Sequence, residues 1–367
     1  MAERMRDGPG ARNQSAWVPW LLGIGMAALL VTFPLLVEGG SRRNVAILVL
    51  LYAGLAQAWN ILGGFAGQIS LGNAAFLGIG AYTSTVMLDR WNVSPWIGMG
   101  CGAVLAALFA VIVGYPIFRL GGHYFAIATI ALAEIMVILF ANWEYVGGAV
   151  GISIPFIRGP DRRPVDSWEF LQFNESRVPY YYITLAMTAL VTLTALIIER
   201  TKPGYYFRAI KNDPLAARAL GVSVLKYKLF AIVISAAFTA MFGTIYAQYL
   251  LFIDPETTMR LELSVLIALV AILGGVGTAA GPLIGAAVMI PLSEYSRGQF
   301  GGSGNALDLV LYGGMVVLVS IFQPNGLIAI WRRWRGRQLS RATPLPATSQ
   351  QEARDEKPLV GTAETDH

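Results

Sequence analysis

The stretch YYFRAIKNDPLAARALGVSVLKYK, residues 205–228, is a cationic, punctuated segment between two long apolar runs. Within it Asp213 precedes Pro214, a pair that predicts a helix start, because the aspartate can accept free backbone N–H groups and proline suits the first helical position. Gly221 stands where a C-terminal helix cap belongs. The stretch therefore predicts a short helix over 214–220, outside the lipid, that joins two membrane helices.

The composition is that of a membrane protein. Hydrophobic residues make up 55% of the 367 residues and charged residues only 13%, whereas about a quarter of the residues of ordinary soluble domains are charged. The net charge of +5 does not indicate a nucleic-acid partner, because the basic residues sit in short stretches that flank the apolar runs. The single cysteine, Cys101, excludes both an intramolecular disulfide and a thiol cluster for a metal.

The apolar runs predict an all-α, polytopic transmembrane bundle with broken or re-entrant helices. A helix needs about 20 apolar residues to cross a membrane, and this length gives about ten spans, with roughly eight to eleven as the range. The eighth and ninth runs are short and joined through glycines, so they fit either two spans or one broken, re-entrant pair. The expected spans are 17–37, 44–62, 69–88, 95–118, 123–142, 179–198, 225–252, 262–276, 278–293 and 306–323.

Basic residues predict the orientation, since cytoplasmic loops carry an excess of lysine and arginine. The loop 199–228 is the most basic connection and is therefore expected in the cytoplasm. With an even number of crossings, both termini also fall in the cytoplasm. Arg42 and Arg43 would then lie outside, against the trend. The basic residues of the loop are Arg200, Lys202, Arg208, Lys211, Arg218, Lys226 and Lys228.

These assignments divide the chain into three parts. A cytoplasmic N-terminal segment, 1–16, precedes a transmembrane domain, 17–332, whose extracytoplasmic loop is 143–178 and whose cytoplasmic loop is 199–228. The remainder, 333–367, is predicted to be a basic and then disordered cytoplasmic tail. Its second part is rich in proline, threonine, serine and charge, and it cannot bury enough apolar area to become ordered.

The short helix also carries a recognisable pattern of small residues. Ala216-Ala217-x-x-x-Gly221 resembles the cytoplasmic coupling motif Glu-Ala-Ala-x-x-x-Gly of ABC importer permeases, with Leu215 in the place of the glutamate. Four further stretches, in order along the chain, resemble the branched-chain amino acid ABC permease family, specifically the longer of its two permease subunits. They are GGFAGQISLGNAAFLGIGAY (63–82), GGHYFAIATIALAEI (121–135), AILGGVGTAAGPLIGA (271–286) and FQPNGL (322–327).

The resemblance implies that the short helix sits in a groove of an ATPase subunit and transmits force. Small side chains at Ala216, Ala217 and Ala219 are expected to leave a flat surface on which a protein can dock closely. From spacing alone, a basic loop that only sets topology and touches lipid headgroups stays open as the alternative. The predicted coupling residues are Asp213, Pro214, Leu215, Ala216, Ala217, Arg218 and Gly221.

The glycine-rich stretch that ends at Tyr82 contains the polar residues Gln68, Ser70 and Asn73. It fits either a broken helix that lines a cavity or a tightly packed helix whose polar groups bond to neighbours, since irregular backbone at membrane depth must be covered by protein or water. We take these four residues and Glu134 as candidate pathway residues.

Glu134 lies near the middle of its span, where an ionised side chain costs about 2.5–3.5 kcal/mol on insertion scales. It belongs either at the pathway or a subunit interface, or in a packed helix where it is neutral or bonded to polar groups. Gly277, Gly281 and Gly285 recur every four residues, a spacing that lets a neighbouring backbone approach closely.

The missing motifs are informative as well. No G-x-x-x-x-G-K-[ST] occurs, so this chain cannot itself hold ATP in a P-loop, and with only two histidines and no catalytic motif we expect neither an enzyme nor catalytic or metal-binding residues. The resemblance implies two ABC ATPase subunits that use ATP and Mg, a homologous second permease and a periplasmic binding protein, in the lipid of a bacterial inner membrane.

The expected function is therefore ATP-driven import of branched-chain amino acids. Within the same class the substrate alternatives are urea, short amides and aromatic acids. From another class the alternative is an ion-coupled secondary transporter, for which Glu134 is the clear acidic candidate deep in a span. Such a transporter needs coupling groups but no docking helix like 214–220.

Overall fold

The computed structural model describes residues 30–34, 39–119, 124–157 and 165–300, with positions 313, 314 and 327. The predicted segments 1–16 and 333–367 lie outside these residues, and so do most of the predicted spans 17–37 and 306–323. The described elements are α2 (Gly40–Asn60), the π-helix η1 (Ile61–Phe65), α3 (Asn73–Trp91), α4 (Pro95–Ile117), α5 (Tyr124–Ala141), the 3₁₀ turns η2 (Glu144–Val146) and η3 (Gly148–Val150), β1 (Ile152–Ser153), α6 (Val178–Arg200), α7 (Lys202–Asn212), α8 (Pro214–Ala219), α9 (Val224–Leu250), β2 (Phe252–Ile253), α10 (Pro255–Thr258), α11 (Leu261–Gly274) and α12 (Gly281–Phe300).

The mostly helical, polytopic architecture confirms the coarse fold prediction. Each apolar run predicted between residues 44 and 293 coincides with a helix, with boundaries that differ by a few residues. Among the described residues, six helices are long and apolar enough to cross a membrane. They are Gly40–Phe65, Pro95–Ile117, Tyr124–Ala141, Val178–Arg200, Val224–Leu250 and Pro255–Gly274.

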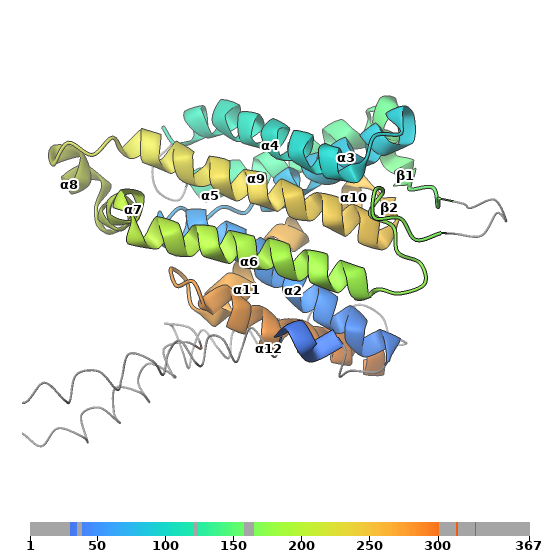
Figure 1. Cartoon of the computed structure of the whole chain (residues 1–367). Helices are drawn as coiled ribbons and strands as arrows, with labels where there is room; N and C mark the ends of the chain where they lie inside the picture. Colours follow the sequence, from blue (N-terminus) through green and yellow to red (C-terminus); the bar gives the residue numbers. More distant parts are fainter. Residues whose placement is uncertain are drawn as a thin grey trace, which may run out of the picture.

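The long helices lie side by side and form a bundle (Figure 1). Helix α9 packs on α3 and α4, while α2 packs on α6, α11 and α12. Large side chains such as Trp59, Phe76 and Phe242 are fully buried between them. Because polar backbone is satisfied within each helix, the bundle can bury these side chains and still face lipid with apolar residues.

The connection between α2 and α3 contains irregular backbone that lies within the bundle. Helix α2 continues as the π-helix η1, and the chain is then irregular until α3 begins at Asn73. Hydrogen bonds from neighbouring helices cover this irregular backbone: Trp59 Nε1 donates to the carbonyl O of Ser70 at 2.6 Å, and the amide of Leu71 donates to Thr129 Oγ1 at 3.0 Å. The amide of Ala74 donates to Ser264 Oγ at 2.8 Å, which ties the start of α3 to α11.

The two ends of the bundle differ. Helices α7 and α8 lie at one end, and the short strands β1 and β2 lie at the other with α10 (Figure 1). The strands are antiparallel and pair Ile152 with Ile253 and Ser153 with Phe252. The predicted loop 143–178 is thus joined by backbone pairing to the segment that follows α9.

Glycines allow the closest helix contacts. On α12, a Cβ added at Gly281 or Gly285 would collide with backbone carbonyls of the α11 segment, so the two backbones lie very close at these positions. Gly277 lies in the turn before α12 and not in a helix, with a φ of +79°, and the backbone that approaches it closely is the carbonyl of Gly64. On α9, a Cβ at Gly243 would collide with the carbonyl of Leu77 in α3.

We predict that Gly243→Leu destabilises the purified chain strongly, because backbone cannot move aside as a side chain can. Overpacking of this kind costs about 1–3 kcal/mol or more. The matched control is Gly100→Leu on α4, where an added Cβ has nothing within 4 Å. The thermal unfolding midpoint in detergent should fall for the first variant and stay close to the starting value for the second. Equal midpoints would contradict the α3–α9 packing.

Candidate functional site

Helix α8 is the feature that stands out beyond the bundle, and it forms as predicted. The Oδ1 atom of Asp213 accepts hydrogen bonds from the amides of Leu215 at 2.8 Å and Ala216 at 3.1 Å. Pro214 is the first helical residue. At the other end Gly221 has a φ of +84°, the left-handed backbone that closes a helix at a glycine.

The side chain of Ala217 corrects one part of the prediction. Ala217 was expected on the docking surface, but it is only 2% exposed and packs against Ile210 of α7 and Val224 of α9. Ala216 and Ala219 are exposed, as predicted. A helix of this length buries one face on its own chain, and the position of Ala217 in the turn puts it on that face. Small size at Ala217 therefore serves contact within the chain.

Exposed leucines form the outer surface of α8. Leu215 is 75% exposed and Leu220 is 84% exposed, although both are large apolar side chains. Each leaves much of its apolar area in water unless another protein covers it, and full burial of a leucine stabilises by about 1.5–3 kcal/mol. Leu215 was singled out from the sequence, whereas Leu220 was missed, because only its position next to the cap shows that it points outward.

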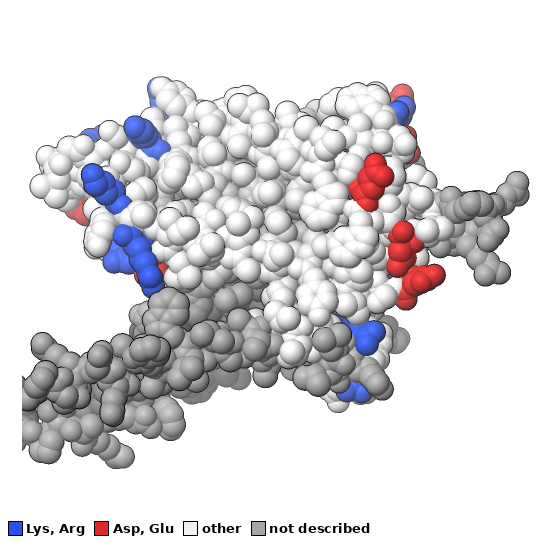
Figure 2. All heavy atoms as spheres, viewed as in Figure 1, with Lys and Arg blue, Asp and Glu red and all other residues white. Residues whose placement is uncertain are grey.

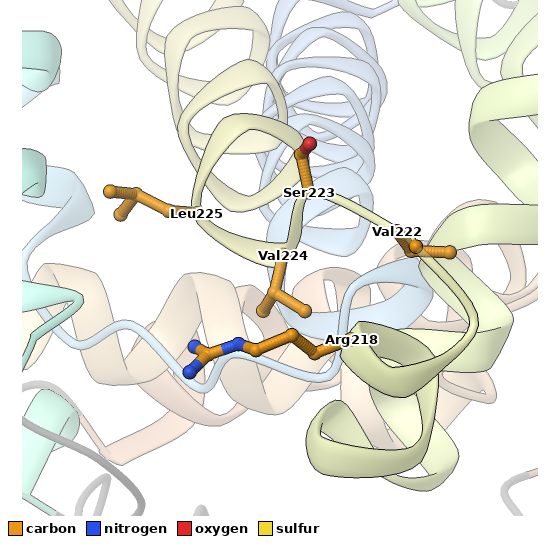
Figure 3. A pocket seen from close by; sticks show the side chains of 6 residues that line it. Arg218, Val222, Ser223, Val224 and Leu225 are labelled. Atoms are coloured by element: carbon orange, nitrogen blue, oxygen red, sulfur yellow. The ribbon is translucent and has the colours of Figure 1, made fainter.

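A hollow of about 370 Å³ lies between the end of α8 and the first turn of α9. Arg218 runs below Val224 in Figure 3, and its guanidinium lies on the same side as Leu225. The hollow is lined by Arg218, Gly221, Val222, Ser223, Val224 and Leu225. Its shape and its guanidinium suit the side chains of a docking protein better than a small buried ligand, because it is open to the surface.

Charge separates the two ends of the molecule. On the face that Figure 2 shows, lysine and arginine predominate at the end formed by α7 and α8. The opposite end carries most of the aspartate and glutamate together with some basic residues, and the surface between the two ends is almost free of charge. The uncharged belt is the part that a bilayer would surround, since charged side chains are costly in hydrocarbon.

The candidate pathway residues lie in different places. Gln68 is half-buried in the irregular segment, where its Nε2 donates to the carbonyl of Ala66 at 3.3 Å. Ser70 and Asn73 are buried near the start of α3. Tyr82 is buried in the middle of α3, where its ring meets that of Phe140 at 4.8 Å between centroids. The structure brings Ser70 and Asn73 together but does not bring Tyr82 to them.

Two of these buried groups lack a partner among the described residues. In that part of the chain neither polar atom of the Asn73 side chain has a hydrogen-bond partner, and the Tyr82 hydroxyl has none either. Unpaired buried polar groups are expensive, which makes them notable in a bundle that otherwise satisfies its backbone. The expectation that the polar groups of this stretch bond to neighbouring helices therefore holds for the backbone of Ser70 and fails for these two side chains.

Glu134 is exposed on the outside of α5. None of the hydrogen bonds and ion pairs found among the described residues involves its carboxylate. Within the described residues Glu134 therefore has no polar partner, and the alternative of a bond to polar groups of a packed helix has no support from this chain alone. The alternative that places Glu134 at a subunit interface or pathway is compatible with its position.

Asn60 is a site residue that the sequence did not single out. Its Oδ1 accepts from the amide of Gly277 at 2.8 Å, and its Nδ2 donates to the carbonyl of Thr278 at 2.9 Å. This one amide therefore joins the end of α2 to the turn between α11 and α12. Its position inside an apolar run was the available signal, because buried polar side chains in such runs need partners.

The fold and α8 together define a class of protein: a helical membrane protein that presents a short, capped helix with exposed leucines beyond the end of its bundle. The comparisons agree with this class. The chain belongs to the family of permease components of branched-chain amino acid transport systems, whose model matches residues 41–320. Members of this family are membrane permeases of ABC transporters, so the chain is a transport subunit and not an enzyme.

Several relatives are similar over most of their length. The high-affinity branched-chain amino acid transport system permease protein LivM of Escherichia coli K12 is 30% identical over 84% of this chain and 75% of the relative. A probable LivM of Methanocaldococcus jannaschii is 24% identical, over 76% of this chain and 86% of the relative. LivH of Salmonella typhimurium is 22% identical, over 76% and 91%. No solved structure matches the chain.

The different settings of Asn60 and Glu134 yield a prediction. Asn60→Leu should destabilise the purified chain by about 1–3 kcal/mol, because it leaves the Gly277 amide and the Thr278 carbonyl without their partner. Glu134→Leu, which introduces the same side chain, should leave its stability unchanged. Thermal unfolding in detergent compares the two variants. If Glu134→Leu were as destabilising as Asn60→Leu, the exposed position of Glu134 would be refuted.

Proposed function

We propose that this chain is the permease subunit that carries branched-chain amino acids across a bacterial inner membrane in an ATP-driven ABC importer. The observation that carries the proposal is the protruding α8, whose exposed Leu215 and Leu220 stand at the basic end of an apolar bundle. Family membership supports the transport class. An ion-coupled secondary transporter would have no use for such a helix, and the comparisons give that alternative no support.

The orientation follows from the charges. The basic end with α7 and α8 faces the cytoplasm, and the acidic end with β1 and β2 faces outward, in line with the rule that basic loops stay inside. Arg42 and Arg43 lie in the first turn of α2, and η1, which continues the other end of α2, contacts α7. The proposed orientation therefore puts these two arginines on the outer side, against the trend of basic residues. With about ten spans, consistent with a helix length of about 20 residues, both termini are cytoplasmic.

The proposed assembly has four further protein subunits of three kinds. Two ATPase subunits dock on α8 and on the matching helix of a second, homologous permease, and they hold ATP and Mg. A periplasmic binding protein delivers substrate to the outer side. Named relatives of both kinds, LivM and LivH, support the presence of two different permeases. Lipid surrounds the uncharged belt, and nucleic acid has no role.

The proposed cycle is alternating access. Closure of the ATPases moves α8, the two permeases open outward toward the binding protein, and hydrolysis restores the inward state. The chain needs only a difference in the affinity of its two conformations for these partners, because a ligand shifts an equilibrium by its differential affinity. Glu134 faces out of this chain, so we place it against the second permease or along the pathway between the two.

The substrate is the finer part of the proposal. Leucine, isoleucine and valine are the proposed cargo, in line with the names of the relatives. Urea, short amides and aromatic acids are the alternatives within the class. Purification of the complex, followed by ATPase assays with loaded binding proteins for each substrate, tests the choice. Stimulation by a leucine-loaded protein is expected, and stimulation by a urea- or amide-loaded protein alone would overturn it.

We predict that a Leu215→Asp, Leu220→Asp double variant loses the ATPase subunits. Removal of two apolar contacts at an interface centre should weaken docking by about 2 kcal/mol or more, which is at least about 30-fold. Co-purification of the ATPase and uptake in cells measure the effect. Val150→Asp is the matched control, since Val150 is 83% exposed at the opposite end of the bundle. Normal docking and uptake by the double variant would refute the role of α8.

A further inference from the structure

Lys211 makes a contact that links two distant parts of the chain. It lies in the last turn of α7, and its Nζ donates to the carbonyl O of Gly64 at 2.9 Å, across 147 residues of sequence. The irregular segment between η1 and α3 also lies against the aliphatic part of the Lys211 side chain, because a Cβ built on Gly67 would be 2.8 Å from Lys211 Cγ. Lys211 therefore contacts η1 through its ammonium group and the irregular segment after η1 through its methylene groups.

The accepting carbonyl of Gly64 belongs to the last helical turn before the chain becomes irregular. Gly64 lies in η1, the π-helical turn at which α2 ends before the irregular segment. Carbonyls in the last turn of a helix have no donor within the helix, so they need one from elsewhere. An ammonium is a strong donor to such a group, because hydrogen bonds with one charged partner are stronger than neutral ones.

The end of α2 next to η1 is also joined to the turn between α11 and α12. The amide and the carbonyl of the α11–α12 turn bond to Asn60, one residue before η1. A Cβ built on Gly277 would lie 3.1 Å from the Gly64 carbonyl and 3.3 Å from Lys211 Nζ. Lys211, Gly64 and Gly277 therefore meet at one point, where α7 touches the ends of α2 and α11.

On its other side Lys211 is fixed to α8. One residue, Asn212, separates it from Asp213, which caps α8. Ile210, Ala217 and Val224 pack together, so α7, α8 and the first turn of α9 form one unit at the end of the bundle (Figure 1). A displacement of α8 moves this unit and, with it, the end of the lysine side chain.

We propose that Lys211 is a positioning residue that connects the docking helix α8 to the interrupted turn η1 and, through Asn60, to the α11–α12 turn. This inference rests on the proposed function of α8. By this route a movement of α8 reaches α2 and α11 directly, in addition to α9, which α8 joins through the chain. The contact sets how much substrate movement follows each ATPase cycle, and it does not contribute to ATPase docking.

The first test uses the complete transporter in proteoliposomes. Lys211→Met should lower the amount of leucine imported per ATP hydrolysed by five-fold or more, while the ATPase still co-purifies in normal amount. Lys211→Arg should restore most of the ratio, because it restores a charged donor. Lys202→Met is the matched control, since it removes the same charge from the first turn of the same helix. A ratio for Lys211→Met equal to that of Lys202→Met would overturn the proposal.

A second measurement needs no partner and separates the two proposals. Hydrogen exchange of the purified chain should be faster over 61–68 and at Gly277 in Lys211→Met than in Lys202→Met. Unchanged exchange would overturn the connection even if the ATPase never binds. Faster exchange with an unchanged transport ratio would show a purely structural contact and would also overturn it. Failure of the unaltered chain to bind an ATPase would refute the function of α8 instead.

Discussion

The structure depends on one constraint: every backbone N–H and C=O group at membrane depth needs a partner. Regular helices meet it within themselves, so the places where a helix is interrupted are the places where the rest of the chain must supply donors and acceptors. The break after α2 receives Trp59, Thr129, Ser264 and Lys211 from four different helices. These hydrogen bonds fix which helices pack next to the connection between α2 and α3.

The same constraint separates the two kinds of surface that the function needs. The uncharged belt consists mostly of apolar side chains, and α4 and α5 expose many large ones. Basic side chains are concentrated at the end formed by α7 and α8, beyond the uncharged belt. A helix as short as α8 is marginal by itself, and it holds its shape because Asp213 caps it and Ala217 packs beneath it.

Much of this architecture could be predicted from the sequence, because hydropathy and caps act locally. The described spans and the α8 helix lie where the apolar runs and the Asp-Pro and glycine signals put them. The inward side of Ala217, the turn position of Gly277 and the outward side of Glu134 could not be predicted, since each depends on which neighbouring helix packs where. Asn60 and Lys211 were missed as partners for the same reason: their acceptors are far away in sequence.

The pairing of β1 with β2 has a consequence for the outer face. This pairing, the hydrogen bond of the Tyr180 hydroxyl to the carbonyl of Leu171 and that of Trp96 Nε1 to the carbonyl of Trp168 hold the described parts of the loop 143–178 against β2, α6 and α4. Under the proposed orientation, a protein that arrives from outside meets a loop whose described parts are already ordered. It loses little conformational entropy on contact, so its encounter is governed by shape and by the acidic charge of that face.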